Sequence, residues 1–402
     1  MNSAPSHVSP SSGSGSQQVD RGTVFAELVG QETVTEQLSR AVASGAPSHA
    51  WLFTGPPGSG RSNAARAFAA ALNCERGDGC GQCRSCRLVA SNSHPAVSLV
   101  STENVSYRID DVRQLISTAQ DRPQGAPWRV IVIEDADRMT ERATNVLLKS
   151  IEEPPPQTVW VLCAPSPADV LVTIRSRCRH VSLRIPPTEA VASLLVERDG
   201  LNESQARFAA RISQNHIGVA RRLAASNEAR ERREKVVALP LRVRSASGAI
   251  LAAGELVSAA QAEADAEAQS RLAAEQAGLR RALGVEPEEK IPPKLRAQFK
   301  RLEEESARRA KRAVTDSMDR TLIDLTAVYR DVLSVKLGAG VELINEHLRN
   351  DLEQLALALS PEQALGCLDA LTSARVRITQ NVPPQLAMEA LMMALIPRRH
   401  RG

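Results

Sequence analysis

The stretch that decides the fold runs from Trp51 to Ser62, Trp-Leu-Phe-Thr-Gly-Pro-Pro-Gly-Ser-Gly-Arg-Ser. From Gly55 on, it fits the phosphate-binding pattern G-x-x-x-x-G-K-[ST], except that Arg61 stands in the lysine position. In a working loop, backbone amides wrap the phosphates, the lysine reaches the terminal phosphates and the hydroxyl holds magnesium. Arginine is a bulkier planar fork and cannot act as the same compact point charge. The stretch therefore predicts a nucleotide-binding fold in which the site for nucleotide hydrolysis is altered. The alternative is a plain strand–helix turn.

The residues around the loop supply the strand–loop–helix context that the pattern requires. Trp51-Leu52-Phe53 is an apolar run directly before the glycines, and an Ala-rich helix is expected from Ser62 to Leu72. The continuous apolar runs 130–133 and 159–163 predict strands buried on both faces, with a helix over 141–153 between them. The predicted fold class is α/β with a parallel sheet.

Composition and length set the broad class of the chain. Its 402 residues fit two or three domains, and a hydrophobic share of 43% is typical of a soluble globular protein. A net charge of +4 permits contact with nucleic acid but does not argue for it. Residues 1–20, rich in Ser, Gly, Pro and Gln, predict a disordered tail and no secretory signal. With no apolar run long enough to span a membrane, we expect no membrane partner and a cytoplasmic location.

The chain is expected to divide into three folded parts after this tail. We predict a P-loop domain over 21–186, a small helical lid over 187–243 and an all-α domain over 244–402. Within the last part, residues 260–312 predict long charged helices whose role the sequence does not give. Their basic cluster, 308–312, could touch DNA phosphates, but a solvated helix face is the favoured interpretation.

Four cysteines crowd into one short segment and predict a metal site. Cys74, Cys80, Cys83 and Cys86 would supply the four soft ligands of tetrahedral Zn²⁺, and a closed site of this kind is structural. Redox or free-thiol roles are the alternatives.

Carboxylates follow the second long apolar run. In ATPases of the P-loop type, this strand ends in an Asp that supports magnesium and a Glu that activates water. Here the order is Glu134 then Asp135, so the two side-chain lengths are exchanged. One methylene displaces the oxygens by about 1 Å, enough to impair catalytic positioning. The alternative is a solvated acidic turn.

An arginine lies on an exposed loop after the later strand, in Ser176-Arg177-Cys178. Such an arginine can complete the active site of a neighbouring subunit by stabilising phosphoryl-transfer charge. Taken alone, a plain surface arginine is the favoured interpretation.

Together these motifs resemble bacterial clamp-loader subunits of the AAA+ class. The resemblance also rests on 29–31, 49–53, 112–115 and 147–154, and covers about residues 22–225. It implies a P-loop domain with an inserted zinc module (74–86), a lid and a helical collar. It also implies that Arg221, three residues after Gly218, is the second sensor arginine. The candidate nucleotide-binding set is then Gly55, Gly58, Ser59, Gly60, Arg61, Ser62, Glu134, Asp135 and Arg221.

Two branches of that family differ at the nucleotide site. For the tau/gamma motor branch, the resemblance implies Lys in the loop, Asp-Glu after the strand and a Thr pair as sensor. This chain has Arg61, Glu134-Asp135 and Ala164-Pro165 at these three places. The chain therefore resembles the companion, delta-prime branch, whose ATP site is degenerate. That implies assembly with delta and tau/gamma subunits and, through the complex, action on primed DNA and the sliding clamp. Arg177 would be a catalytic arginine in trans, and ATP binding by the chain itself is doubtful.

Two other functions remain open at this point. One is an active motor subunit, which ATPase activity of the purified chain would reveal. The other is a zinc-containing nucleic-acid binding module, against which the aromatic share of 2% and the lack of a strong basic patch count.

Overall fold

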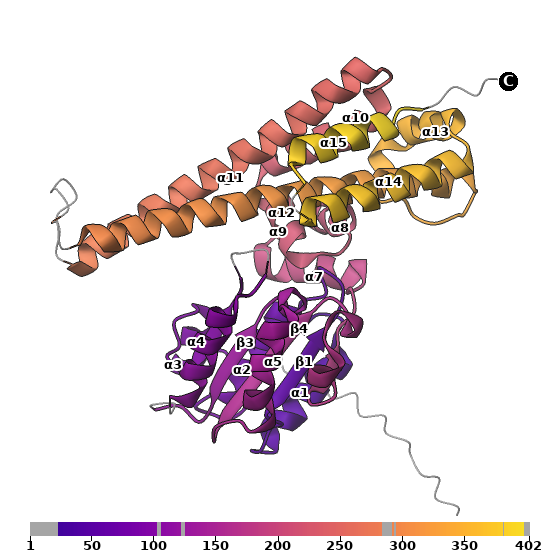
Figure 1. Ribbon diagram of the computed structural model, residues 1–402. Coiled ribbons are helices and arrows are strands. Elements are labelled where there is room, and N and C mark those ends of the chain that lie inside the picture. Colours follow the sequence, from indigo (N-terminus) through magenta and orange to yellow (C-terminus); the bar gives the residue numbers. More distant parts are fainter. Residues whose placement is uncertain are drawn as a thin grey trace, which may run out of the picture.

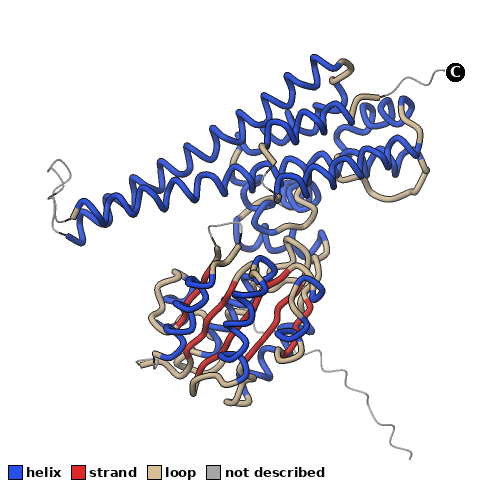
Figure 2. The backbone as a smooth tube through the Cα atoms, in the orientation of Figure 1, coloured by secondary structure: helices blue, strands red, loops and turns tan. Residues whose placement is uncertain are grey.

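A parallel sheet with helices on both faces forms one end of the molecule, and helices alone form the rest (Figure 1). The computed structural model describes residues 23–102, 106–121, 125–283, 292, 295–380 and 382–397. The predicted tail, 1–20, lies outside the described residues. The red strands of Figure 2 lie in a single layer, well apart from the long helices. The α/β class with an all-helical C-terminal region is therefore confirmed.

The sheet has five parallel strands in the order β2-β3-β4-β1-β5. The order places the strand before the glycine loop next to the strand that ends at Ala164, and that strand's other neighbour is the one that precedes Glu134-Asp135. Carboxyl ends of parallel strands meet at one edge, where ligands of open α/β sheets bind. The strands are β1 (Ala50–Thr54), β2 (Val97–Val100), β3 (Arg129–Ile133), β4 (Thr158–Ala164) and β5 (Arg179–Ser182).

Alternate residues of each strand pack into two different apolar clusters. In β1, Trp51 and Phe53 face one cluster and Leu52 faces the other, and all three are fully buried. The same alternation in β3 and β4 explains why both are continuous apolar runs. One face is covered by α1 (Glu32–Ala43), α2 (Arg61–Leu72) and α3 (Arg84–Ala90). The other is covered by α4 (Ile109–Gln120), α5 (Glu141–Glu152) and α6 (Val172–Arg175).

Three short helices form a separate small core next to the sheet. They are α7 (Thr188–Asp199), α8 (Glu203–Ile212) and α9 (Ile217–Ala225), and they bury Val191, Leu195 and several alanines against one another. They lie between the sheet and the long helices in Figure 1. The predicted domain boundaries at 186 and 243 themselves stay predictions.

The C-terminal helices share one extended apolar core. Two long helices, α11 (Ala246–Leu283) and α12 (Arg296–Lys336), run side by side and project beyond the other helices as a hairpin (Figure 1). Val236 and Val237 of α10 (Asn227–Arg242) belong to this core rather than to that of the three short helices. The remaining helices of the core are α13 (Arg349–Ala358), α14 (Pro361–Thr379) and α15 (Pro384–Ala394). No helix among the described residues is long and apolar enough to cross a membrane.

Candidate functional site

The glycine loop joins β1 to α2 in the conformation that its glycines permit. Gly58 has φ +91° and Gly60, the N-cap of α2, has φ +88°, values that L side chains rarely adopt. The loop therefore delivers Arg61 as the first residue of α2, with Ser62 next to it. Amides at a helix N-terminus favour anions, so this is the position where the predicted phosphate site would lie.

Two polar atoms of the loop are buried with no hydrogen-bond partner among the described residues. They are Oγ of Ser59 and Nη1 of Arg61. Leaving such groups unpaired is costly, so they mark places where an anionic oxygen would be stabilised. At Gly55 a side chain would collide, since a Cβ there would lie 2.5 Å from Ser59 Oγ. A phosphate at this loop, with arginine in place of lysine, stays a prediction.

The acidic pair after β3 is engaged by protein groups. The main-chain oxygen of Glu134 accepts a 2.6 Å hydrogen bond from the Tyr107 hydroxyl, which fixes the turn. Asp135, in the left-handed region with φ +52°, accepts a 2.8 Å hydrogen bond at Oδ2 from Nη2 of Arg312. Arg138 Nε lies 3.8 Å from the same oxygen. A guanidinium therefore binds the carboxylate that stands at the water-activating position of a working ATPase.

The end of β4 offers no side-chain donor to a nucleotide. Ala164 is buried and Pro165 follows it, at the position where a Thr pair is expected in the motor branch. The oxygen of Pro165 accepts a 3.2 Å hydrogen bond from the amide of Gly55, so this segment braces the start of the glycine loop.

The short helices cover the loop with a histidine, and Arg221 points elsewhere. A Cβ on Gly58 would lie 3.1 Å from the His216 side chain. Burial, helped by Arg222 and Arg320, lowers the pKa of His216, so its ring is uncharged at neutral pH. Arg221 instead forms a two-pronged ion pair with Asp199 at 2.8 and 2.9 Å. The structure thus pairs Arg221 with Asp199, the last residue of α7, and its role as a nucleotide sensor stays a prediction.

Arg177 lies on the surface just after α6. Its Nε is 2.5 Å from Oε1 of Glu152, at the end of α5, and its Nη1 donates to the Thr173 oxygen at 2.8 Å. The side chains of Arg177 and Glu152 are 40% and 43% exposed, so the pair is reached by solvent and by any neighbouring molecule. Leu171 and Val172 beside it are exposed apolar residues.

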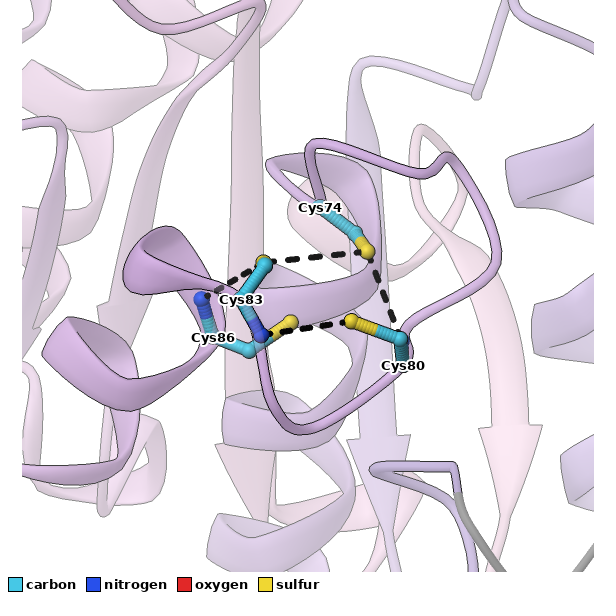
Figure 3. Close-up of side chains that lie close together, drawn as sticks. All are labelled: Cys74, Cys80, Cys83 and Cys86. Atoms are coloured by element: carbon cyan, nitrogen blue, oxygen red, sulfur yellow. Dashed lines mark hydrogen bonds between the residues drawn. The ribbon is translucent and has the colours of Figure 1, made fainter.

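The four cysteines converge between α2 and α3 (Figure 3). Their Sγ atoms all lie within 4.8 Å of one another, and those of Cys74 and Cys83 are 4.0 Å apart. Ligand sulfurs around tetrahedral zinc are about 3.8 Å apart, given Zn–S bonds of about 2.3 Å. The cluster therefore could hold a metal ion with only a small contraction.

Backbone amides prepare these sulfurs for the thiolate form. The amides of Cys80, Cys83 and Cys86 donate to the sulfurs of Cys74, Cys80 and Cys83 at 3.3, 3.4 and 3.4 Å. Although burial opposes ionisation of Cys83, hydrogen bonds from the backbone of Cys86 and Glu75 outweigh it and lower the pKa to about 7. Burial raises the pKa of Cys86. A bound cation would favour the thiolate at all four positions.

Sequence reasoning missed two residues that shape the nucleotide site. Arg312 was expected on a solvated helix face, but it contacts Asp135 across 177 positions of sequence, and its side chain is only 25% exposed. His216 carried no signal, because a lone histidine before a helix has no distinctive pattern. The basic cluster around Arg312 was the only sequence feature that could have directed attention to it.

Comparisons with known proteins find similarity to subunits of DNA polymerase III. Residues 30–187 match the family model described as DNA polymerase III, delta subunit. The chain is 38% identical over 188 residues to the DNA polymerase III subunit gamma/tau of Mycobacterium bovis, covering 45% of this chain and 32% of that relative. The chain thus spans about a third of the length of the gamma/tau relatives it matches. The DNA polymerase III subunit delta' of Bacillus subtilis is 26% identical over 91% of this chain and 96% of its own length.

Solved structures with a similar backbone include a DNA polymerase III gamma subunit-related protein from Thermotoga maritima. It has a TM-score of 0.46 at 16% identity and covers 91% of this chain and 99% of its own. The DNA clamp loader delta protein of Bacillus subtilis has a TM-score of 0.32 at 11% identity, over 90% of this chain and 100% of its own.

Proposed function

We propose that the chain is the delta-prime-type member of a bacterial clamp-loading complex, because it matches a DNA polymerase III delta subunit model over residues 30–187 and a delta' subunit along most of its length. In that role it assembles with delta and tau/gamma subunits and helps to place the sliding clamp on primed DNA. It supplies Arg177 to the ATP site of a neighbouring subunit and does not hydrolyse ATP itself.

The observation that carries this proposal is the contact between Asp135 and Arg312. Asp135 stands where a motor subunit has its water-activating carboxylate, and a guanidinium at 2.8 Å binds the oxygen that would have to accept the proton of the attacking water. Arg61 in the loop and the donor-free Ala164-Pro165 segment support the same conclusion from two other sides. Three independent changes at one site favour a subunit without turnover over the motor alternative.

The proposed in-trans role rests on the accessibility of Arg177. Only an exposed arginine can reach a neighbour's phosphates, and this one is 40% exposed with a single, equally exposed carboxylate partner. The apolar side chains of Leu171 and Val172 next to it are suited to contact with another subunit.

The test is to reconstitute the complex with the wild-type chain or with Arg177→Ala, and to measure clamp-stimulated ATP hydrolysis and clamp loading. We expect normal assembly and a clear loss of both activities. An arginine finger can contribute roughly 10³-fold in rate, but several ATP sites share the work, so the observed loss will be smaller. Arg175→Ala is the matched control, because Arg175 is also exposed on α6 and bonds only to the Pro167 oxygen among the described residues.

Two results would contradict the proposal. Equal rates for Arg177→Ala and wild type, with normal assembly, would reduce Arg177 to a surface residue and leave a scaffold role. Steady ATP turnover by the pure chain, abolished by Arg61→Ala, would assign it to the motor branch.

We further propose that the metal at Cys74, Cys80, Cys83 and Cys86 is zinc with a structural role. Four thiolates leave no open coordination position, and the donor set is the one that zinc prefers. The segment that carries the cluster also binds residues far from it in sequence, since the Val24 amide donates to the Gly79 oxygen at 2.7 Å.

A further inference from the structure

A cavity of about 630 Å³ lies where the sheet, the three short helices and the C-terminal helices meet. Pro56 and Pro57 of the glycine loop form one wall, and residues of α9, α10, α11, α12 and α14 form the others. Its volume is in the range of small-molecule sites. None of the roles described above uses it.

Arginines gather in this cavity around a single glutamate. Glu263 of α11 lies 3.3 Å from Arg222 Nη1, 2.5 Å from Arg232 Nη1 and 4.0 Å from Arg320 Nη2. These arginines come from α9, α10 and α12, so three separate helices direct positive charge to one point. One carboxylate cannot neutralise three guanidinium groups, and the excess charge there is positive.

The other acids of the cavity do not compensate this excess. Asp319 is held by a two-pronged ion pair with Arg375 at 2.7 and 3.1 Å, and Asp324 by Arg233 at 3.0 Å. Asp316 contributes one further carboxylate to the lining. Burial also raises the pKa of Asp316 and Asp324.

Hydrogen-bond donors in the cavity remain available to a ligand. Arg320 reaches Glu263 only at 4.0 Å, beyond hydrogen-bond distance. Arg233 lines the cavity with its side chain 3% exposed, and its Nη1 is buried with no partner among the described residues. Arg222, Arg232 and Arg320 are 42%, 38% and 33% exposed, so a small anion can reach them from solvent.

We propose that this cavity is a binding site for a phosphate group, distinct from the predicted anion position at the N-terminus of α2. Guanidinium groups bind phosphate oxygens through paired N–H donors, and a convergent set of them is the arrangement that phosphate recognition requires. The phosphate comes either from free inorganic phosphate or from a nucleoside triphosphate. Because the site joins all three parts of the chain, its occupation holds them together.

The experiment titrates the full chain with inorganic phosphate and, separately, with ATP, both without added magnesium and at constant ionic strength. We expect a saturable heat of binding for the wild type. For Arg320→Gln we expect the affinity to fall by about tenfold or more, as for loss of a charged hydrogen bond. Arg320→Lys keeps the charge and should recover part of the affinity. Binding of inorganic phosphate identifies the free anion as sufficient, whereas binding of ATP alone assigns the ligand to the nucleotide.

Two further variants separate this site from other positively charged places. Arg211→Gln is the matched control, since Arg211 bonds to Glu342 at 2.8 Å and does not line the cavity; it should bind as the wild type does. Arg61→Ala removes the loop arginine and should leave cavity binding intact. The proposal is overturned if neither ligand binds, if Arg320→Gln binds like the wild type, or if Arg61→Ala alone abolishes binding.

Discussion

The contact between Asp135 and Arg312 should couple the stability of the sheet to the C-terminal hairpin. The perturbation is a double-mutant cycle with Asp135→Asn, Arg312→Gln and both together. Asparagine is the suitable replacement because Asp135 has φ +52°, a conformation that Asn tolerates. The cycle isolates the pairwise term from the other contacts of Arg312, which include Asp316 at 3.7 Å.

The expected magnitude follows from distance and exposure. The two side chains are 2.8 Å apart and are 25% and 26% exposed, between a surface pair and a buried one. Exposed pairs contribute about 0.2–1 kcal/mol, and breaking a buried pair costs about 3–5 kcal/mol. We therefore expect a coupling free energy of about 1–2 kcal/mol, lower at high salt.

The assay uses the distribution of tryptophan in the chain. All three tryptophans, Trp51, Trp128 and Trp160, lie in the sheet-bearing part, so their fluorescence reports its unfolding in urea. Far-UV circular dichroism follows mainly the long helices. A coupling free energy below about 0.3 kcal/mol in the fluorescence transition would refute the reasoning, because distant sites add within that range.

A matched pair provides the control for this cycle. Arg309 and Glu275 form an ion pair at 2.5 Å with side chains 23% and 30% exposed, but both lie within the α11–α12 hairpin. The cycle Glu275→Gln with Arg309→Gln should leave the fluorescence transition unchanged. A shift equal to that of the Asp135–Arg312 cycle would show that the hairpin's own stability, not the contact, is being measured.

Two further predictions concern the metal and the nucleotide. Metal analysis of the purified chain should give about one zinc per chain, and Cys83→Ser should lower that content and loosen the segment 74–86 while the sheet stays folded; an unchanged zinc content would exclude the cluster as the site. The pure chain should not hydrolyse ATP, and Arg61→Lys alone should not create turnover, because Asp135 stays bound to Arg312; a lysine variant with steady hydrolysis would show that the loop residue is the only lesion.

The strands could be predicted from the sequence because the pattern that marks each of them lies within one short segment. In β3 and β4 every residue is buried, so the pattern is a continuous apolar run whatever the rest of the chain does. The glycine loop was equally visible, because a helix that begins at Arg61 needs left-handed glycines before it. The cysteine cluster closes within one segment, so its spacing alone was enough to suggest the metal site.

The long-range contacts could not be predicted in the same way. Arg312 and Asp135 are 177 positions apart, and no periodic pattern relates residues at that distance. The arginines around Glu263 come from three helices whose sequences are each compatible with a solvated surface. Arg221 has the sequence position of a nucleotide sensor, but Asp199 determines where its side chain lies. Such choices depend on how the helices pack, which is a property of the whole chain.

The proposed division of labour is also favoured by the energies of the two arginine contacts. Arg177 and Glu152 form an exposed pair, and such a pair costs only about 0–1 kcal/mol to break. A charge-assisted hydrogen bond to a neighbour's phosphate gains about 1.5–3 kcal/mol, so Arg177 can be transferred with a net gain. For Asp135 the balance is opposite, because an attacking water would first have to displace a less exposed Arg312. The chain is therefore better suited to donate a group to a neighbour's ATP site than to build a working one of its own.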